Sequence, residues 1–233
     1  MKKFFTLIAA VALAASVNAQ GTYAVQVGDK VNAGDQIKSV ENITLTYMEN
    51  DGTAFAVGKK MVNWADADFT AYVCGVNNGK LVSGAEPTGC VYKFETVKAG
   101  SVTVGVQLGG TKGFHILDAD FAEVAPASYN LPAAKDGESQ KFTLNEKNEN
   151  IIAAKSNGIV TFNVAEGGTY YVFAAGTKLG FYGFKYEVGT STGISSVNAA
   201  AAKKDGKTYN MAGQEVSSSA KGLIIKNGKK YVK

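Results

Sequence analysis

The amino-acid sequence predicts an all-β fold, a sandwich or a barrel, and three observations support this. Gly, Asn and Asp turn signals recur about every eight to twelve residues across residues 20–188, a spacing typical of short strands joined by turns. β-branched and aromatic residues alternate with polar or small ones between the turns, and in Ser101–Leu108 every second residue is Val or Leu. Helical periodicity is weak, and Pro126 and Pro132 argue against a helix in the least regular stretch.

Individual strands are predicted wherever β-branched or aromatic residues alternate or run between two turn signals. In chain order these segments are Tyr23–Val27, Ile43–Tyr47, Phe69–Val76, Val91–Phe94, Ser101–Leu108, Phe114–Leu117, Lys141–Leu144, Gly158–Val164, Thr169–Ala174 and Leu179–Val188.

Two stretches of this body resemble each other. Phe94 and Phe162 each precede, at the same spacing, a Gly-Ser or Gly-Thr strand start at Gly100 and Gly168. Each stretch continues into a Gly-Thr-Lys turn and an aromatic strand, which predicts a meander of three strands joined by turns. The similarity is either an internal repeat or the result of similar turn chemistry in two unrelated hairpins.

The N-terminus is predicted to be a cleaved export signal. Lys2 and Lys3 precede the apolar run Phe4–Ala15, and Val17-Asn18-Ala19 is a small-x-small cleavage site. The apolar run is too short for a permanent transmembrane helix. We therefore expect a signal peptide over residues 1–19 and a mature chain that starts at Gln20, with no transmembrane helix.

Charge is distributed unevenly along the chain. All 24 basic residues are Lys, against 20 acidic residues, for a formal net charge of +4. Residues 20–197 hold 14 Lys and 18 acidic residues, whereas residues 198–233 hold eight Lys and two acidic residues. The absence of Arg removes the side chain best suited to bidentate contacts with phosphate and guanine, so no nucleic-acid partner is expected. The single His argues against a His-rich metal site.

A boundary separates the body from a C-terminal tail. The composition of Gly189–Gly193 is typical of a flexible linker, and Asn227-Gly228 between two β-rich runs predicts a hairpin. We therefore expect a β-sandwich body over residues 20–188, a linker over 189–205 and a short β segment over 206–233.

The tail resembles the C-terminal sorting segments of bacterial type IX (Por) secretion substrates. The matching residues are Tyr209, Gly213, Gln214, Val216, Lys221, Gly222, Gly228, Lys229, Lys230 and Lys233. Ile224 stands where these segments usually have an aromatic residue, and the unit is shorter than a full sorting domain. The resemblance implies transport by the outer-membrane secretion machinery, with removal of the tail and attachment to the cell surface.

The body resembles the jelly-roll β-sandwich modules of secreted polysaccharide-degrading and surface proteins. The similar residues are the Gly89–Phe94 strand entry, the Gly-Ser and Gly-Thr strand starts and the aromatic run Lys178–Tyr186. This resemblance implies a jelly-roll-like antiparallel sandwich, and it leaves the ligand undefined because fold alone does not determine function.

Cys74 and Cys90 are the only two cysteines, and they flank the polar loop between two predicted strands. An even pair in an exported chain favours a disulfide, which by loop closure would contribute about 3 kcal/mol. Two reduced structural thiols are the alternative. His115 lies within a predicted strand, where a partly buried structural position is favoured over a catalytic one.

The string Asp-Ala-Asp-Phe occurs twice and supplies a candidate structural calcium site. Its carboxylates, Asp66 with Asp68 and Asp118 with Asp120, share a face in extended chain and are the kind of oxygen ligand that calcium prefers. Solvated turn residues are the alternative interpretation. Carboxylate pairs also serve glycosidases, but no catalytic residue is predicted here.

Aromatic residues supply the candidate ligand-binding site. Trp64, Tyr72 and Tyr92 flank the cysteine loop, and Tyr182 belongs to a dense aromatic cluster. An exposed aromatic face would suit stacking against a sugar ring, whereas burial in the core is the alternative for each ring.

These features together predict a non-catalytic exported or surface-attached binding module. The expected ligand is a polysaccharide or a cell-surface glycan, and no cofactor is expected beyond the candidate calcium. The alternatives are a structural or adhesive surface protein without a small ligand and, less favoured, a glycan-active enzyme.

We expect the mature extracellular protein to start at Gln20 and to lack its Lys-rich C-terminal segment, because the two terminal segments resemble export and sorting signals. Intact-mass measurement of the secreted protein with terminal peptide mapping tests this expectation. A secreted chain that retains Lys233 would contradict removal of the sorting segment.

Overall fold

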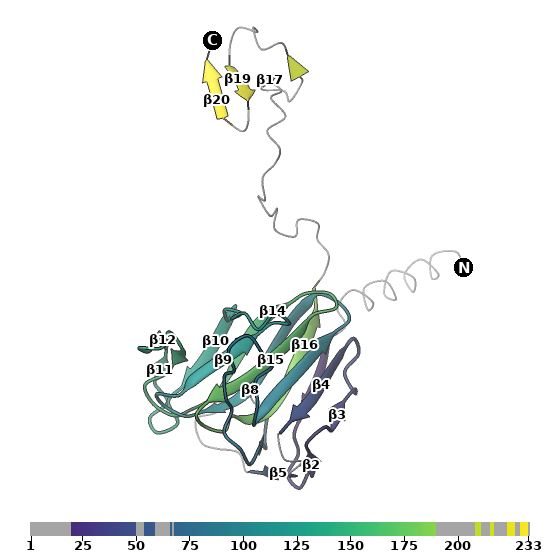
Figure 1. Ribbon diagram of the computed structural model, residues 1–233, viewed down its shortest axis with the longest axis vertical. Coiled ribbons are helices and arrows are strands. Elements are labelled where there is room, and N and C mark those ends of the chain that lie inside the picture. Colours follow the sequence, from purple (N-terminus) through teal and green to yellow (C-terminus); the bar gives the residue numbers. More distant parts are fainter. Residues whose placement is uncertain are drawn as a thin grey trace, which may run out of the picture. The chain divides into compact units, whose positions relative to one another are not determined.

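The computed structural model describes residues 20–49, 54–58, 66 and 68–189, together with the backbone of four short tail strands (Figure 1). The predicted signal peptide, Trp64 and most of the predicted linker lie outside these residues. The chain divides into two compact units between Thr190 and Ser191, and each unit is described by itself.

The body consists of two antiparallel sheets packed together, so the predicted all-β sandwich is confirmed. The first sheet has nine strands in the order β11 (Ser139–Gln140), β10 (Ser128–Pro132), β14 (Ser156–Val164), β8 (Gly100–Leu108), β16 (Gly180–Val188), β6 (Val73–Cys74), β5 (Ala54–Val57) and β2 (Val31–Asn32), with β1 (Gln20–Ala24) paired to β16. The second sheet has seven strands in the order β12 (Thr143–Leu144), β13 (Asn150–Ile151), β9 (Gly113–Leu117), β15 (Thr169–Ala175), β7 (Val91–Thr96), β4 (Ile43–Met48) and β3 (Gln36–Ile37). No helix long and apolar enough to cross a membrane occurs in the part of the chain that the structure describes.

Successive long strands alternate between the two sheets, as they do in a jelly roll. The strands β7, β8 and β9 lie in the second, first and second sheet, whereas β14, β15 and β16 lie in the first, second and first. The predicted three-strand meanders are therefore wrong, because the turns carry the chain across the sandwich instead of back along one sheet. Turn residues specify a reversal of direction without specifying which sheet receives the next strand.

Aromatic rings from both sheets fill the space between them. Tyr92 of β7 stacks on Phe181 of β16, with centroids 4.4 Å apart and planes at 22°. Phe94 of β7 meets Phe184 of β16 edge to face at 5.3 Å, and it meets Phe162 of β14 in the same way at 6.2 Å. All five rings are 0% exposed, and each contributes about 1.5–3 kcal/mol or more of transfer free energy.

Two facing glycines make room for another buried ring, that of Phe69. Gly105 of β8 pairs with Gly183 of β16 next to an irregularity in the strand register. A Cβ on Gly105 would lie 2.6 Å from Cδ2 of the fully buried Phe69. Gly183 has a φ of +139°, and a Cβ there would lie 2.1 Å from the carbonyl oxygen of Tyr23. The close approach of β1 and Phe69 to this strand pair therefore requires both glycines.

The tail is a separate small antiparallel sheet in the order β18 (Glu215–Val216), β17 (Thr208–Asn210), β19 (Leu223–Lys226) and β20 (Lys229–Val232). Lys226 pairs with Lys229 across β19 and β20, the register expected for the predicted two-residue hairpin.

We expect Gly105→Ala to lower the free energy of unfolding by about 1–3 kcal/mol, because the added methyl would overlap the fully buried ring of Phe69. Gly109→Ala is the matched control, since its Cβ would meet only Lys112 Cγ, on a flexible exposed side chain, at 3.3 Å. Chemical denaturation of both variants tests this packing constraint. Equal midpoints for the two variants would contradict it.

Candidate functional site

Two of the predicted sugar-stacking residues, Tyr92 and Tyr182, are 0% exposed. The Tyr92 hydroxyl donates to the carbonyl oxygen of Leu179 at 2.7 Å, and the Tyr182 hydroxyl donates to Oδ1 of Asn157 at 3.2 Å. The expectation that these two rings face a ligand is therefore wrong. Their hydroxyls have internal acceptors, which is how a buried tyrosine satisfies its polar end.

Of the other two predicted rings, only Tyr72 lies within the described residues. Tyr72 is half-buried and packs against Tyr182, with ring centroids 5.2 Å apart. Its ring also lies against Gly58 and Gly180, where a Cβ would approach it to 2.2 Å and 3.1 Å. Trp64 lies outside the described residues.

The first Asp pair, Asp66 and Asp68, binds an ammonium group of the protein itself. Lys185 Nζ lies 2.6 Å from Asp66 Oδ2 and 2.8 Å from Asp68 Oδ2. Burial alone would lower the pKa of Lys185, but the two carboxylates outweigh it and raise this pKa. A cation already present in the chain thus occupies the position that calcium was expected to fill.

In both Asp-Ala-Asp-Phe strings the first carboxylate caps a turn. Asp66 Oδ1 accepts from the Asp68 N–H at 2.9 Å, and Asp118 Oδ1 accepts from the N–H groups of Asp120 and Ala122 at 2.9 Å. Within the described residues, no group of three or more His, Cys, Asp or Glu is placed to hold a metal ion. The first Asp of each string therefore stabilises a local turn, and the geometry does not support the predicted calcium site.

Cys74 and Cys90 are free thiols at the junction of the two sheets, and no disulfide links them. The Cys74 thiol donates to the Gly75 carbonyl oxygen at 3.4 Å, and the Gly75 N–H donates to Cys90 Sγ at 3.1 Å.

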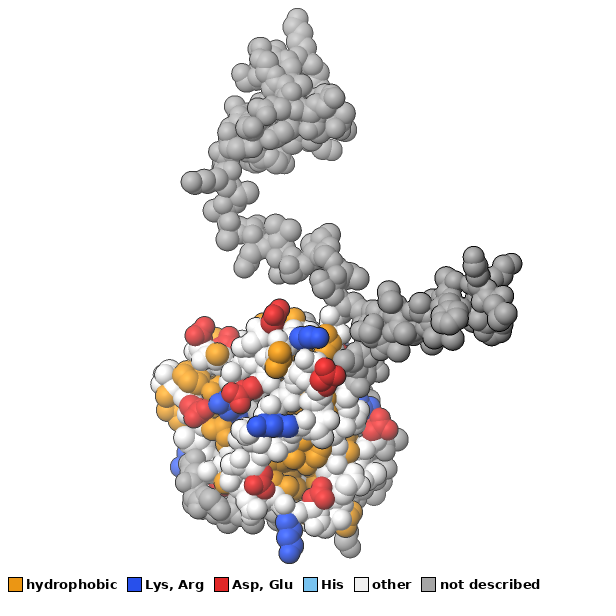
Figure 2. Space-filling model, turned by 90° about the vertical axis from the view of Figure 1, so that its right-hand side faces the viewer, with side chains coloured by type: hydrophobic (Ala, Val, Ile, Leu, Met, Phe, Trp, Pro, Cys, Tyr) orange, Lys and Arg blue, Asp and Glu red, His pale blue; other side chains and the backbone are white. Residues whose placement is uncertain are grey.

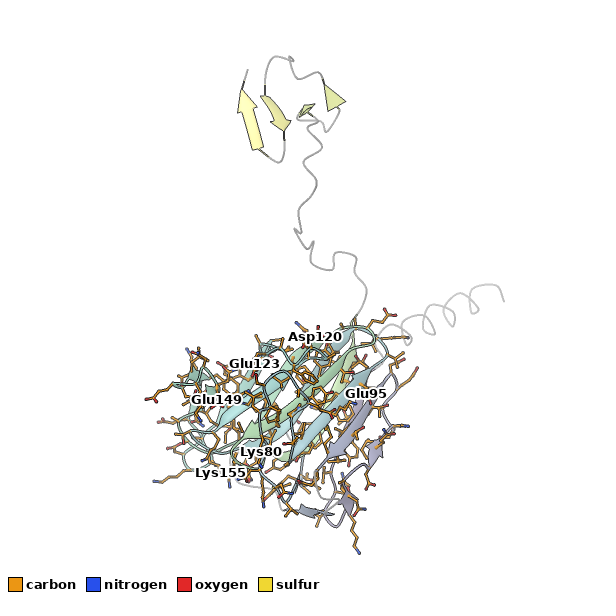
Figure 3. All side chains as sticks on the ribbon, in the orientation of Figure 1. Lys80, Glu95, Asp120, Glu123, Glu149 and Lys155 are labelled. Carbon is orange, nitrogen blue, oxygen red and sulfur yellow. The ribbon has the colours of Figure 1, made fainter. Side chains whose placement is uncertain are left out.

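His115 is buried between two carboxylates on the outer face of the second sheet. Its Nδ1 lies 2.5 Å from Glu123 Oε1, and its Nε2 lies 3.5 Å from Glu149 Oε1. The two glutamates are labelled in Figure 3. The imidazole stacks on Phe173 of β15 at 4.9 Å. With the residue only 1% exposed, no substrate reaches either ring nitrogen, so His115 serves to tie the segments on both sides of β9 to the sheet.

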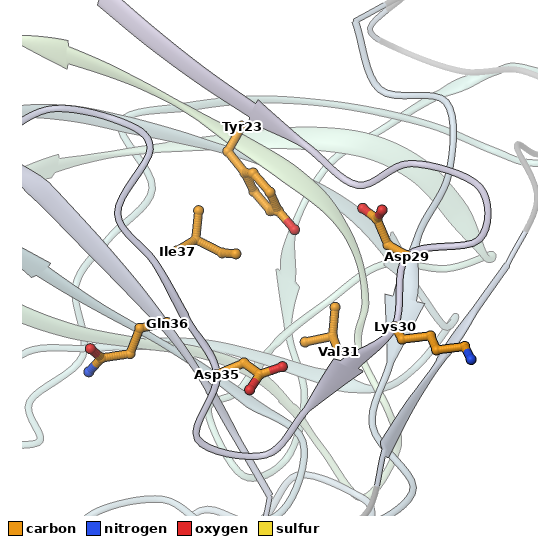
Figure 4. A pocket seen from close by; sticks show the side chains of 7 residues that line it. All are labelled: Tyr23, Asp29, Lys30, Val31, Asp35, Gln36 and Ile37. Atoms are coloured by element: carbon orange, nitrogen blue, oxygen red, sulfur yellow. The ribbon is translucent and has the colours of Figure 1, made fainter.

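A cavity of about 370 Å³ opens where β1, β2 and β3 come together (Figure 4). Its volume lies within the range of small-molecule sites, roughly 300–1,000 Å³. The lining combines carboxylate, phenol, amide and aliphatic side chains: Tyr23, Asp29, Lys30, Val31, Asp35, Gln36 and Ile37. None of the residues predicted from the sequence as ligand-binding belongs to this set.

The two carboxylates of the cavity are held in place by tight turns. Asp29 Oδ2 accepts from the Gln26 N–H, and Asp35 Oδ2 accepts from the Asn32 N–H, each at 2.8 Å. Each Asp follows a glycine of positive φ, so the paired Gly-Asp turns six residues apart were the sequence signal that could have identified the site. Among the described residues neither carboxylate forms an ion pair.

The phenol of Tyr23, which lines the cavity, is paired with a second phenol, Tyr47, which is not among the lining residues. The Tyr23 and Tyr47 hydroxyls lie 3.1 Å apart, and Tyr47 is fully buried. Burial, assisted by the nearby Asp29 charge, raises the pKa of both tyrosines, so both stay neutral hydrogen-bonding groups over the physiological pH range. Lys30 points away from the other lining side chains in Figure 4, which leaves the carboxylates and the Tyr23 hydroxyl facing the cavity.

A scan of protein-family models and a search of curated proteins each found no match to this chain.

We expect Tyr92→Phe to lower the free energy of unfolding by about 1–2 kcal/mol, because it leaves the buried Leu179 carbonyl without its phenol donor. Thermal denaturation together with a glycan-binding assay tests this assignment. If the variant were as stable as the wild type but bound glycans more weakly, Tyr92 would have to be reassigned as a ligand-stacking residue.

Proposed function

We propose that this protein is a non-catalytic, exported binding module and that the cavity between β1, β2 and β3 binds carbohydrate. The observation that supports the proposal is the mixed lining of that cavity. Fixed carboxylates and a neutral phenol stand beside Val31 and Ile37 in a space of about 370 Å³.

This lining matches the chemistry of a sugar residue. A sugar presents hydroxyl groups around its edge and C–H groups on its faces, so it needs hydrogen-bond acceptors next to apolar surface. Asp29 and Asp35 supply charged acceptors, whose hydrogen bonds contribute about 1.5–3 kcal/mol each. Because turn hydrogen bonds already orient both carboxylates, little conformational entropy is lost on binding.

The two ends of the chain support the proposed location. The signal-like residues 1–19 direct export, and the sorting-type residues 206–233 direct passage through the outer-membrane secretion machinery to the exterior or the cell surface. The mixed surface of the body, with acidic and basic side chains interspersed among apolar ones, is seen in Figure 2.

We expect Asp35→Asn to weaken binding to a recognised oligosaccharide by roughly tenfold, because it removes a charged acceptor and preserves the turn through Asn Oδ1. Affinity electrophoresis against a panel of soluble polysaccharides identifies the ligand, and calorimetry then gives the dissociation constants.

The matched control is Glu146→Gln, which removes one negative charge from an exposed side chain outside the cavity. It should bind as the wild type does. No retardation of the wild type by any polysaccharide would overturn the carbohydrate proposal and favour a structural or adhesive protein. Equal weakening of oligosaccharide binding in both variants would show that binding depends on the net charge of the protein and not on the cavity.

A further inference from the structure

The cavity beside β1 carries two negative charges that the described residues do not neutralise. Asp29 and Asp35 both line it, and neither forms an ion pair in the part of the chain that the structure describes. Lys30 belongs to the same lining, but in Figure 4 its side chain points away from the other labelled residues. The cavity therefore offers a bound group two carboxylates, with the lysine of its lining directed elsewhere.

A second aspartate pair in the same body shows what such charges bind. Lys185 Nζ lies 2.6 Å from Asp66 Oδ2 and 2.8 Å from Asp68 Oδ2, so one ammonium group serves two carboxylates. An ammonium has three N–H donors and no acceptor, which suits a set of oxygen acceptors. At the cavity the chain supplies the oxygens, and among the described residues it does not supply the ammonium. A ligand amine would complete the arrangement.

Both cavity carboxylates lie close to one pair of phenols. Burial is the largest cause that raises the pKa of Tyr47, followed by the neighbouring Tyr23 phenol and then by the charges of Asp29 and Asp35. The Tyr23 hydroxyl, which lies 3.1 Å from that of Tyr47, belongs to a residue of the cavity lining. A group bound beside the Tyr23 hydroxyl is therefore exposed to the negative potential of both carboxylates.

Backbone turns hold one oxygen of each carboxylate and leave the other for a ligand. Asp29 Oδ2 accepts from the Gln26 N–H, and Asp35 Oδ2 accepts from the Asn32 N–H, each at 2.8 Å. Within the described residues, Oδ1 of neither aspartate accepts a hydrogen bond. Because the turns already orient both side chains, two directed acceptors are available with little loss of conformational entropy.

These charges discriminate among sugars by the groups that the sugar ring carries. A protonated amine adds a Coulomb attraction to the hydrogen bond that any hydroxyl would form with a carboxylate, whereas the carboxylate of a uronic acid is repelled. The charge of the body has the same sign, since residues 20–197 hold 14 Lys and 18 acidic residues. Cationic glycans are therefore favoured both during approach and inside the cavity.

We propose that the cavity selects glycans with free, protonated amino groups, the class of glucosamine-containing polysaccharides, over neutral and acidic glycans. The inference rests on the proposed carbohydrate binding and names its ligand class. The sugar ammonium donates to Asp29 and Asp35, and the Tyr23 hydroxyl bonds a neighbouring sugar hydroxyl. Val31 and Ile37 contact the C–H face of the ring.

The test compares three tetrasaccharides that share one backbone and differ only at C2. Calorimetry at mildly acidic pH measures binding of the chitosan, cellulose and chitin tetrasaccharides, which carry an ammonium, a hydroxyl and an N-acetyl group at that carbon. We expect the chitosan tetrasaccharide to bind at least about tenfold more tightly than the other two. Tetralysine, which supplies ammonium groups without a sugar ring, should bind at least about tenfold more weakly than the chitosan tetrasaccharide.

Two variants and a matched control locate the preference. Asp29→Asn and Asp35→Asn keep a turn acceptor and should each bring the chitosan-to-cellulose affinity ratio toward one. Asp136→Asn is the control, because Asp136 is an exposed turn residue outside the cavity whose carboxylate also accepts a backbone N–H. It should leave the ratio unchanged, and circular dichroism checks that all three variants fold.

The outcomes separate this inference from the proposed function. Equal affinity for the three tetrasaccharides, or binding of a different polysaccharide but not of chitosan, would overturn the amino-sugar preference and leave carbohydrate binding intact. Binding of no polysaccharide at all would overturn both. Tetralysine binding as tight as chitosan binding, or an equal loss in Asp136→Asn, would show general attraction of cations and would overturn the preference.

Discussion

The stack of aromatic rings between the two sheets is the interaction on which the rest of this structure depends. Neither sheet alone could bury the rings of Tyr92, Phe94 and Phe181, because each ring is covered by residues from the opposite sheet. The sandwich therefore forms as a single unit. The chain passes from one sheet to the other between successive long strands and so supplies both layers. Burial of apolar surface is the dominant favourable term in folding, and in the described part of this body the aromatic rings supply much of it.

This central packing also determines where functional groups can lie. Buried tyrosine hydroxyls need internal hydrogen-bond acceptors. The Tyr92 hydroxyl therefore donates to the Leu179 carbonyl oxygen, and the Tyr182 hydroxyl donates to Asn157 Oδ1. Polar groups with room for a ligand occur at the margin, where the short strands β2 and β3 leave a cavity beside β1. The thiol pair lies at another margin, the crossing between β6 and β7.

The fold class could be predicted from the sequence because alternation and turn chemistry are local properties. Ser101–Leu108 shows this well, since its apolar face is buried as its pattern indicates. Six of the described strands of the body were missed, because strands of two to four residues and a strand that contains proline carry little pattern: β2, β3, β5, β10, β11 and β13. The choice of sheet for each strand was missed as well, since it depends on contacts between distant segments.

The site was less predictable for two physical reasons. In β15 and β16 both faces are largely buried, so alternation could not separate core rings from exposed ones. Lys185 reaches Asp66 across 119 residues of sequence, which no spacing rule within the Asp-Ala-Asp-Phe string could indicate. The cavity was missed because Asp29 and Asp35 are common turn residues, and only the fold brings them together beside Tyr23.

Backbone amide chemical shifts recorded during an oligosaccharide titration would show whether the cavity beside β1 binds carbohydrate. The ligand would be the best binder from a polysaccharide panel. Binding in this cavity should produce saturable shifts concentrated at Tyr23, Asp29, Val31, Asp35 and Ile37, with the aromatic core unmoved. Saturable shifts centred elsewhere on the sandwich, or no shifts with any glycan, would contradict it.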